Sequence, residues 1–222
     1  MLHDFHTHTF FSDGELSPVE LIHRAFNKGY STIGITDHVA VGSLRRVILE
    51  ITEDCALAKK YWKILAIPGV ELTHLPCEAI DEVACKAKEL GALLVVVHGE
   101  TSVEPVPDGT NLAAIQSPYV DILAHPGEIT DEEATLAAKN NTFIELSARH
   151  GHSRTNRHIA DVCQKMGAKL LVNSDAHNED DLLTPELTSD ILREAGLDQA
   201  HYRQILEENP LLLMKRLNVH TI

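Results

Sequence analysis

Histidines and carboxylates recur directly after the short apolar runs of this sequence. The chain carries 14 histidines, more than its 12 glycines or 9 prolines, although Phe, Trp and Tyr make up only 5% of it. Imidazole and carboxylate together suit zinc, manganese or iron, and the two rings of an extended His-x-His segment can reach one ion from the same side. The candidate metal ligands are His6, His8, Asp13, His38, Glu71, His98, His125, Asp175 and His177.

These candidates are too many for one ion. A catalytic zinc takes three protein ligands and a water molecule, so the set predicts two or three divalent transition-metal ions that share at least one ligand. Glu71 is the expected bridge, because a carboxylate has two oxygens to divide between cations whereas an imidazole offers one lone pair. A lone histidine in a loop is more commonly a solvated side chain, so the prediction rests on the joint occurrence of these residues.

The elements that must position these residues alternate along the chain. An amphipathic stretch, a Gly or Asn stop and a β-branched run recur four times, which is the pattern of alternating helices and strands. Helix ends are expected at Gly29, Gly91, Asn141 and Gly167, and helix starts at the capping boxes 17–20 and 130–133. Strands are expected at 2–5, 32–36, 64–70, 93–97, 120–123, 142–146 and 169–172.

Seven strands with interleaved helices predict an α/β protein. Several runs are apolar throughout, as in parallel strands covered on both faces. An eight-stranded barrel usually takes about 250 residues, so seven units in 222 residues predict a small, distorted TIM-like barrel, with a doubly wound open sheet as the alternative. In both folds the carboxyl ends of the strands meet at one rim, where active sites form. The site is expected there.

One domain is expected over residues 1–222, with C-terminal helices from about residue 185. The apolar run 210–214 could pack on the body of the protein or join subunits of a homo-oligomer.

The composition excludes several classes of protein. Lys and Arg total 19 against 33 for Asp and Glu, and the resulting charge of −14 disfavours bulk nucleic-acid binding and anionic lipid surfaces. No apolar run approaches the roughly 18 to 20 residues that cross a bilayer. The four cysteines have no metal-finger spacing and the N-terminus shows no signal peptide, so a reduced, cytoplasmic protein is expected.

The motifs at the strand ends, taken in order, resemble the PHP (polymerase and histidinol phosphatase) superfamily. They are His6-Thr7-His8, Ser12-Asp13-Gly14, Thr36-Asp37-His38, Gly69-Val70-Glu71, His98, His125-Pro126 and Asp175-Ala176-His177. The resemblance covers residue 1 to about residue 180 and implies a distorted (β/α)7 barrel with a trinuclear metal site that hydrolyses phosphoesters. Within this superfamily, the chain is similar to small archaeal-type proteins named histidinol-phosphatase-like.

The resemblance also implies how the ligands are shared. One ion would be held by His6, His8, Glu71 and Asp175, a second by Glu71, His98 and His125, and a third by Asp13, His38 and His177. Some members carry His where this chain has Asp13, and Asp is a harder ligand.

Phosphoester hydrolysis also follows from the residues themselves. Clustered ions lower the pKa of a bound water toward neutrality and neutralise charge on the phosphate oxygens. Glu71, Asp175 and His177 are the expected catalytic residues, and Asp175, His177 or a metal-bound water could give the leaving alkoxide its proton. Arg149, Arg154 and His152 are the expected substrate-binding residues, although both arginines could instead pair with acids such as Glu145 or Asp161.

The expected function is hydrolysis of a phosphoric monoester in a small phosphorylated metabolite. A phosphodiesterase or exonuclease on short oligonucleotides would use the same ions, but few basic and aromatic residues are available to bind a nucleic acid. A non-catalytic metal-stabilised module is the other alternative. An amidohydrolase-type deaminase would share the His-x-His start but not the motifs at 37–38 and 69–71.

Overall fold

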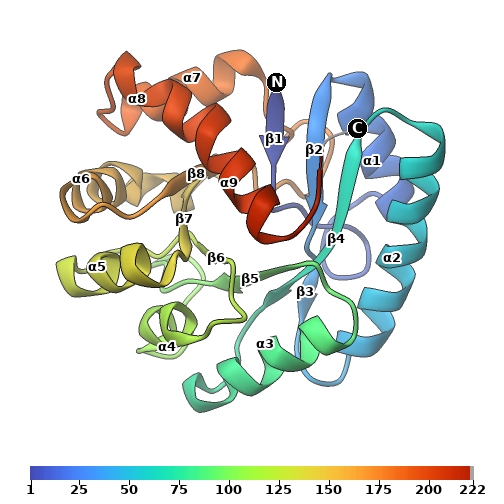
Figure 1. The fold of residues 1–222 in the computed structure, drawn as a ribbon, viewed down its shortest axis with the longest axis horizontal. Coiled ribbons are helices and arrows are strands. Elements are labelled where there is room, and N and C mark those ends of the chain that lie inside the picture. The colour runs from blue at the N-terminus through green and yellow to red at the C-terminus, as the bar shows by residue number, and fades with distance from the viewer. Residues whose placement is uncertain (221–222) are drawn as a thin grey trace.

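The computed structural model describes residues 1–220, in which seven parallel strands form a nearly closed barrel (Figure 1). In barrel order the strands are β1 (Leu2–Asp4), β2 (Tyr30–Ile35), β4 (Leu65–Leu72), β5 (Leu94–His98), β6 (Ile122–Ala124), β7 (Phe143–Ser147) and β8 (Leu170–Asn173). A two-residue strand that the sequence did not predict, β3 (His38–Val39), pairs with β4. The distorted (β/α)7 barrel is therefore confirmed, and the open sheet is wrong.

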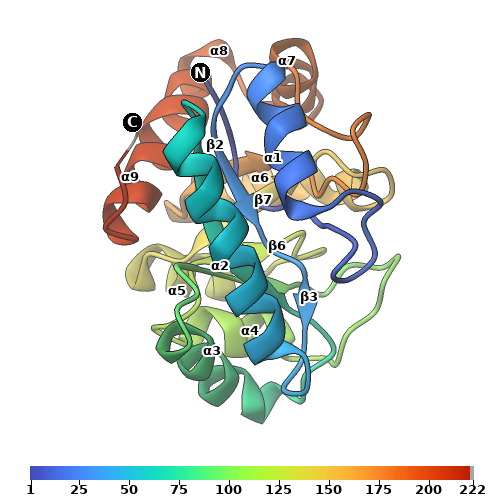
Figure 2. The same cartoon turned by 90° about the vertical axis from the view of Figure 1, so that its right-hand side faces the viewer.

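Helices cover the outside of the barrel (Figures 1 and 2). They are α1 (Pro18–Asn27), α2 (Leu44–Tyr61), α3 (Ile80–Glu89), α4 (Thr110–Gln116), α5 (Asp131–Asn140) and α6 (Asn156–Met166), with short 3-10 turns η1 (Cys77–Ala79) and η2 (His152–Thr155). The C-terminal part adds α7 (Pro185–Glu194), α8 (Gln199–Arg203), a π-helical segment η3 (Gln204–Glu208) and α9 (Asn209–Arg216). None of the helices within residues 1–220 is long and apolar enough to cross a membrane.

Local sequence signals explain where the helices begin and end. The Thr130 side chain accepts from the backbone N–H of Glu133 while Glu133 accepts from Thr130, a complete capping box at the start of α5. Ser17 caps α1 in the same way, but the Glu20 carboxylate accepts from Arg24 instead of closing the box. The four expected helix ends all have positive φ, at Gly29, Gly91, Asn141 and Gly167.

Two separate apolar cores hold the barrel. The larger one lies between the strands and the surrounding helices. The second fills the interior of the barrel and is closed at one end by Leu213 and Met214 of α9 and by Leu217 directly after it. The run 210–214 therefore packs within the chain, although Leu211 and Leu212 remain about half exposed.

The seam between β8 and β1 closes the barrel close to the predicted ligands. One parallel bridge joins Thr7 to Ala176, and the backbone N–H of His8 donates to the Ala176 carbonyl at 2.8 Å. Further from the rim, a side chain takes the place of a backbone partner across the seam: Asn173 Oδ1 accepts from the Phe5 N–H at 2.9 Å. The seam therefore depends on polar side chains as well as on strand pairing.

Arg216 ties α9 to the barrel. Its Nε donates to Asp121 Oδ1 at 3.1 Å. Its two terminal nitrogens donate to backbone carbonyls of the two loops beside it, those of Pro118, Val120, Asn140 and Asn141. The guanidinium thus satisfies carbonyls that would otherwise lie without partners beneath the helix.

Arg216→Ala should lower the free energy of unfolding by about 2–3 kcal/mol, somewhat less than removal of one partner from a fully buried ion pair. The expected loss is smaller than for a fully buried pair because the Arg216 side chain is 25% exposed, although its partner Asp121 is buried. Chemical denaturation measures it. Arg203→Ala is the matched control, because that side chain is 77% exposed. It should change stability by less than about 0.5 kcal/mol, and an equal loss in both variants would contradict the role given to Arg216.

Candidate metal centre

The carboxyl ends of the strands bring most of the predicted ligands into contact. Eight of the nine lie in groups whose ligand atoms are all within 4.8 Å of one another. The ninth, His98, belongs to none of these groups among the described residues, whereas His152 joins His125 and Asp175 in one of them. The convergence at one rim is a property of the structure, and the role of each residue as a ligand stays a prediction.

The backbone is strained where two of these side chains enter the site. His125 has φ +28° and Asp175 has φ +54°, backbone conformations that residues other than glycine rarely adopt. Each follows the end of a strand and turns inward. Such strain persists only where the surrounding structure imposes it, and it is concentrated at functional sites.

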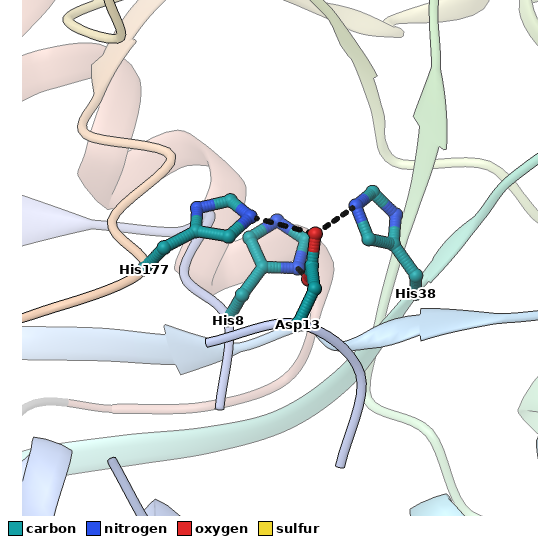
Figure 3. A group of neighbouring side chains, drawn as sticks. All are labelled: His8, Asp13, His38 and His177. Carbon is teal, nitrogen blue, oxygen red and sulfur yellow. Dashed lines mark hydrogen bonds and ion pairs between the residues drawn. The ribbon is translucent and has the colours of Figure 1, made fainter. Parts of the chain in front are cut away.

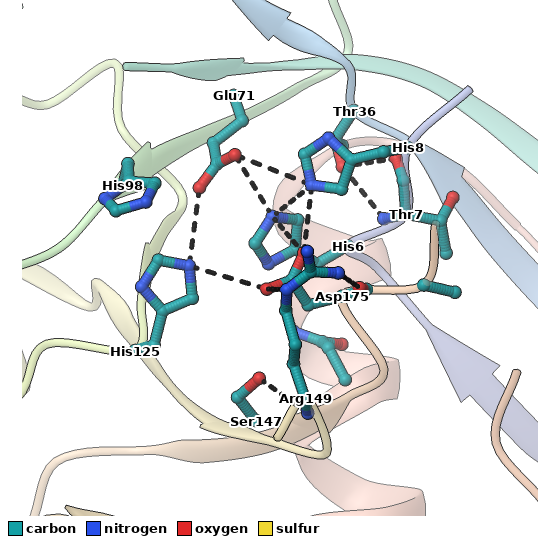
Figure 4. A network of polar contacts seen from close by, with 12 residues as sticks. His6, Thr7, His8, Thr36, Glu71, His98, His125, Ser147, Arg149 and Asp175 are labelled. Atoms are coloured by element: carbon teal, nitrogen blue, oxygen red, sulfur yellow. Dashed lines mark hydrogen bonds and ion pairs between the residues drawn. The ribbon is translucent and has the colours of Figure 1, made fainter. Parts of the chain in front are cut away.

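Glu71 lies at the middle of the cluster and is fully buried. Its Oε2 is 3.3 Å from His6 Nε2 and 3.6 Å from His8 Nε2, while its Oε1 is 3.6 Å from His125 Nε2 (Figure 4). The shortest contact of Oε2 is with His38 Nδ1, at 2.7 Å. The two oxygens therefore face different imidazoles, as the bridging role requires.

Asp175 approaches the same group from the loop after β8, next to the segment that carries His6 and His8. Its Oδ1 is 3.1 Å from His8 Nε2 and 3.9 Å from His6 Nε2. The Nε2 atoms of His6 and His8 lie 3.0 Å apart, so both rings point into one small space. This arrangement corresponds to the first ligand set that the resemblance implied.

A second group lies nearer the surface and contains Asp13 (Figure 3). Asp13 Oδ2 is 3.2 Å from His177 Nε2 and 3.6 Å from His38 Nε2. His8 adjoins this group as well, with Nδ1 3.8 Å from Asp13 Oδ1. Asp13 is 51% exposed, so this end of the cluster opens to solvent.

Asp37 organises the loop that presents Asp13. Its carboxylate accepts from the backbone and hydroxyl groups of Thr9 and Ser12 and contacts no ligand histidine among the described residues. These four hydrogen bonds hold the loop between β1 and α1 against the end of β2. Asp37 therefore acts on the position of Asp13 through the backbone.

His98 is turned away from its predicted partners. Its Nδ1 lies 3.1 Å from the Gly99 carbonyl and its Nε2 lies 3.2 Å from Glu104 Oε2. The ring still packs edge-on against His125, with centroids 4.5 Å apart. Glu104, on an exposed loop, thus faces the imidazole that was expected to face Glu71.

The ionisable groups perturb one another strongly. Burial disfavours a charged Glu71, but His38 and His6 outweigh it and hold the Glu71 pKa well below its usual value. Burial raises the pKa of Asp175 to about 7, and Glu71 and Glu145 add to this against the opposing effect of His6. Burial and neighbouring imidazoles hold the pKa of His8 well below its usual value. The buried carboxylates and imidazoles of this cluster therefore compensate one another's charge only in part.

The residues fit a divalent metal centre. Glu71 Oε1 and the Nδ1 atoms of His8 and His125 are buried and lack a hydrogen-bond partner among residues 1–220. Glu71 Oε2 faces imidazole nitrogens only, the nearest of them His38 Nδ1 at 2.7 Å. Buried polar atoms are normally paired, so this concentration of unpaired polar atoms fits a site that binds cations. The mixture of imidazole and carboxylate suits zinc, manganese or iron.

The three expected substrate-binding residues lie in different environments. Arg149 lies at the cluster: its Nη1 contacts His177 Nδ1 and donates to the Asp175 carbonyl at 3.3 Å. His152 is buried, with Nε2 3.8 Å from Asp175 Oδ2. Arg154 is exposed and forms no ion pair with the described residues.

Glu145 is a site residue whose role the sequence reasoning missed. It does not pair with Arg149 at the surface but is fully buried, and its Oε2 lies 2.8 Å from His6 Nδ1. A signal was available: Phe143, Glu145 and Ser147 alternate along β7, and Phe143 belongs to the apolar interior of the barrel. Alternation therefore directs Glu145 inward.

Curated relatives match along most of the chain. An uncharacterised protein of Methanocaldococcus jannaschii is 45% identical over 98% of this chain and 100% of its own length. A protein of Thermoanaerobacter sp. named as a probable phosphatase is 29% identical, over 88% of this chain and 87% of its own length.

Solved structures share the fold at low sequence identity. A chain of archaeal ribonuclease P with mature tRNA has a TM-score of 0.71 at 18% identity, covering 97% of this chain and 91% of that one. Histidinol phosphate phosphatase from Lactococcus lactis has a TM-score of 0.63 at 18% identity, covering 89% and 94%. The family model for the PHP domain matches residues 4–152. With this match and the ligand groups at the barrel rim, the chain belongs to the PHP family of metal-dependent phosphoesterases.

Proposed function

We propose that this protein hydrolyses a phosphoric monoester of a small molecule, with two or three divalent ions held at the rim of the barrel. The observation that supports it most is the position of Glu71, which is fully buried with its two oxygens turned toward different imidazoles. The related Lactococcus protein is named as a phosphatase and is complexed with zinc, L-histidinol and phosphate.

Two groups of side chains would hold the ions. His6, Glu71, His125 and Asp175 belong to the buried sets and Asp13, His38 and His177 to the outer one, and His8 belongs to both. Ions bound there would activate water as the nucleophile and neutralise charge on the phosphate oxygens. His98 would join the buried group if its ring turned from Glu104 toward Glu71.

Arg149 is placed to bind the phosphate. Its Nε lies 3.8 Å from Asp175 Oδ2, and its Nη2 has no hydrogen-bond partner among residues 1–220. The Arg149 side chain is 29% exposed, so a solute can reach it from solvent. A planar guanidinium matches two phosphate oxygens, which would place the ester beside Asp175 and His177, the candidate proton donors.

The charge around the opening favours a small substrate. Asp13 and Glu104 lie at the mouth and are 51% and 47% exposed. The whole chain carries a formal charge of −14, which repels a long polyanion. A monoester with a single phosphate can enter such a site, whereas a nucleic-acid strand would meet repulsion along its length.

Purified protein should retain at least two equivalents of transition metal and cleave p-nitrophenyl phosphate faster than its bis-ester, because the site holds enough ligands for more than one ion. Elemental analysis and turnover measure both quantities. Removal of the metal with a chelator should abolish turnover, and adding Zn²⁺ or Mn²⁺ should restore it. Faster cleavage of the bis-ester would instead favour a phosphodiesterase.

Glu71→Gln should lower kcat by at least about 100-fold, because the amide keeps the shape of the side chain but loses the charge that two ions would share. Metal content should fall in parallel, while circular dichroism shows an intact fold. Glu128→Gln is the matched control at a side chain that is 78% exposed. Wild-type turnover in Glu71→Gln would remove the bridging role.

Arg149→Ala should raise KM for phosphate esters by about 10-fold or more, as expected for loss of a charge-assisted bidentate contact. Inorganic phosphate should inhibit this variant more weakly to a similar degree. Arg154→Ala should behave as wild type, because Arg154 is exposed and forms no ion pair among the described residues. An unchanged KM in Arg149→Ala would exclude the arginine from substrate binding.

A further inference from the structure

We infer that Glu145 and Asn173 form a positioning pair that sets the ring of His6 for metal binding, an inference that rests on the proposed function. Glu145 lies on β7 and Asn173 ends β8, and both side chains are fully buried. Neither belongs to the ligand groups at the rim. Hydrogen bonds join both side chains to Phe5 and His6, directly after β1.

The contacts form a closed circuit. The Phe5 N–H donates to Asn173 Oδ1 at 2.9 Å, and Asn173 Nδ2 donates to Glu145 Oε2 at 2.9 Å. The same Glu145 oxygen lies 2.8 Å from His6 Nδ1. The circuit begins at the backbone of Phe5, directly after β1, and returns to the side chain of His6, so the ring is fixed relative to the segment that carries it.

This circuit determines which nitrogen of His6 faces the cluster. An ionised carboxylate only accepts hydrogen bonds, so Nδ1 of His6 must be the donor. The lone pair of the neutral ring then lies on Nε2, which points toward Glu71 Oε2 at 3.3 Å and Asp175 Oδ1 at 3.9 Å. A carboxylate behind a ligand histidine both orients the ring and strengthens it as a ligand.

The arrangement is costly to the fold, which argues against a purely structural role. Glu145 Oε1 is buried and has no hydrogen-bond partner among the described residues. A buried carboxylate with an unpaired oxygen destabilises the protein, and an apolar residue of similar size would pack this wall of the barrel at lower cost. The contact with His6 gives the carboxylate a function that an apolar side chain could not supply.

Asn173 connects this positioning to closure of the barrel. Its side chain accepts from Phe5 across the β8–β1 seam while it donates to Glu145. One residue therefore joins the seam and the ligand, so the orientation of His6 depends on the seam being closed.

The test measures Zn²⁺ affinity by chelator competition, together with the melting temperature of the metal-free protein, for wild type, Glu145→Ala and Glu145→Gln. Glu145→Ala should weaken Zn²⁺ binding by about 10- to 100-fold, the usual effect of removing such a partner. Glu145→Gln keeps an acceptor oxygen and should recover part of the affinity. Glu145→Gln keeps the volume of the side chain, so its melting temperature should stay near that of wild type, whereas Glu145→Ala leaves a cavity and should melt at a lower temperature.

Asp121→Asn is the matched control. Asp121 is also a buried carboxylate that accepts from a strand N–H, that of Val95 at 2.9 Å, but it pairs with Arg216 beneath α9. This variant should lose stability and keep wild-type Zn²⁺ affinity.

The outcomes separate the two proposals. Unchanged Zn²⁺ affinity in Glu145→Ala, or an equal loss in Asp121→Asn, would overturn the positioning role. If wild-type protein binds Zn²⁺ but hydrolyses no phosphoester, the proposed function is wrong. The Zn²⁺ affinities of the Glu145 variants then still decide whether Glu145 positions His6. Wild-type protein that binds no metal would overturn both.

Discussion

Confinement of ionisable side chains in a space with little water is the constraint on which this molecule depends. Glu71, His6 and His8 are fully buried, and Arg149 is the one arginine or lysine that forms an ion pair with the cluster among residues 1–220. Burying charge without full compensation costs several kcal/mol per group, and left-handed backbone at positions such as His125 and Asp175 costs about 1–3 kcal/mol each. Bound cations would relieve much of the electrostatic part.

The stability that offsets this cost comes from parts of the chain that do no chemistry. The barrel interior is apolar below the cluster and is closed by α9, and a second apolar layer lies under the helices. The polar centre is therefore confined to one end of a well-packed scaffold. The sequence of loops such as the one that carries Glu104 can change without disturbing the interior of the barrel, because these loops lie beyond the ends of the strands.

The sequence predicted the convergence of the site because parallel strands impose it: once His6, Glu71 and Asp175 are assigned to strand ends, they must meet. Strand limits were less accurate, and β4 continues to Leu72, so Glu71 lies inside the strand while its side chain faces the barrel. Alternation along β7 could have identified Glu145. The turn of His98 toward Glu104 could not be predicted, since side-chain orientation depends on contacts between loops far apart in the chain.

The closed end of the barrel also determines how the molecule can be attached to something else. Met1 and Leu2 line a small cavity with Pro210 of α9, so β1 starts on the face where α9 lies, remote from the rim. A surface or fusion partner joined near either of these segments would hold the molecule with its reactive mouth facing outward. Immobilisation in this orientation leaves diffusion into the cluster unobstructed.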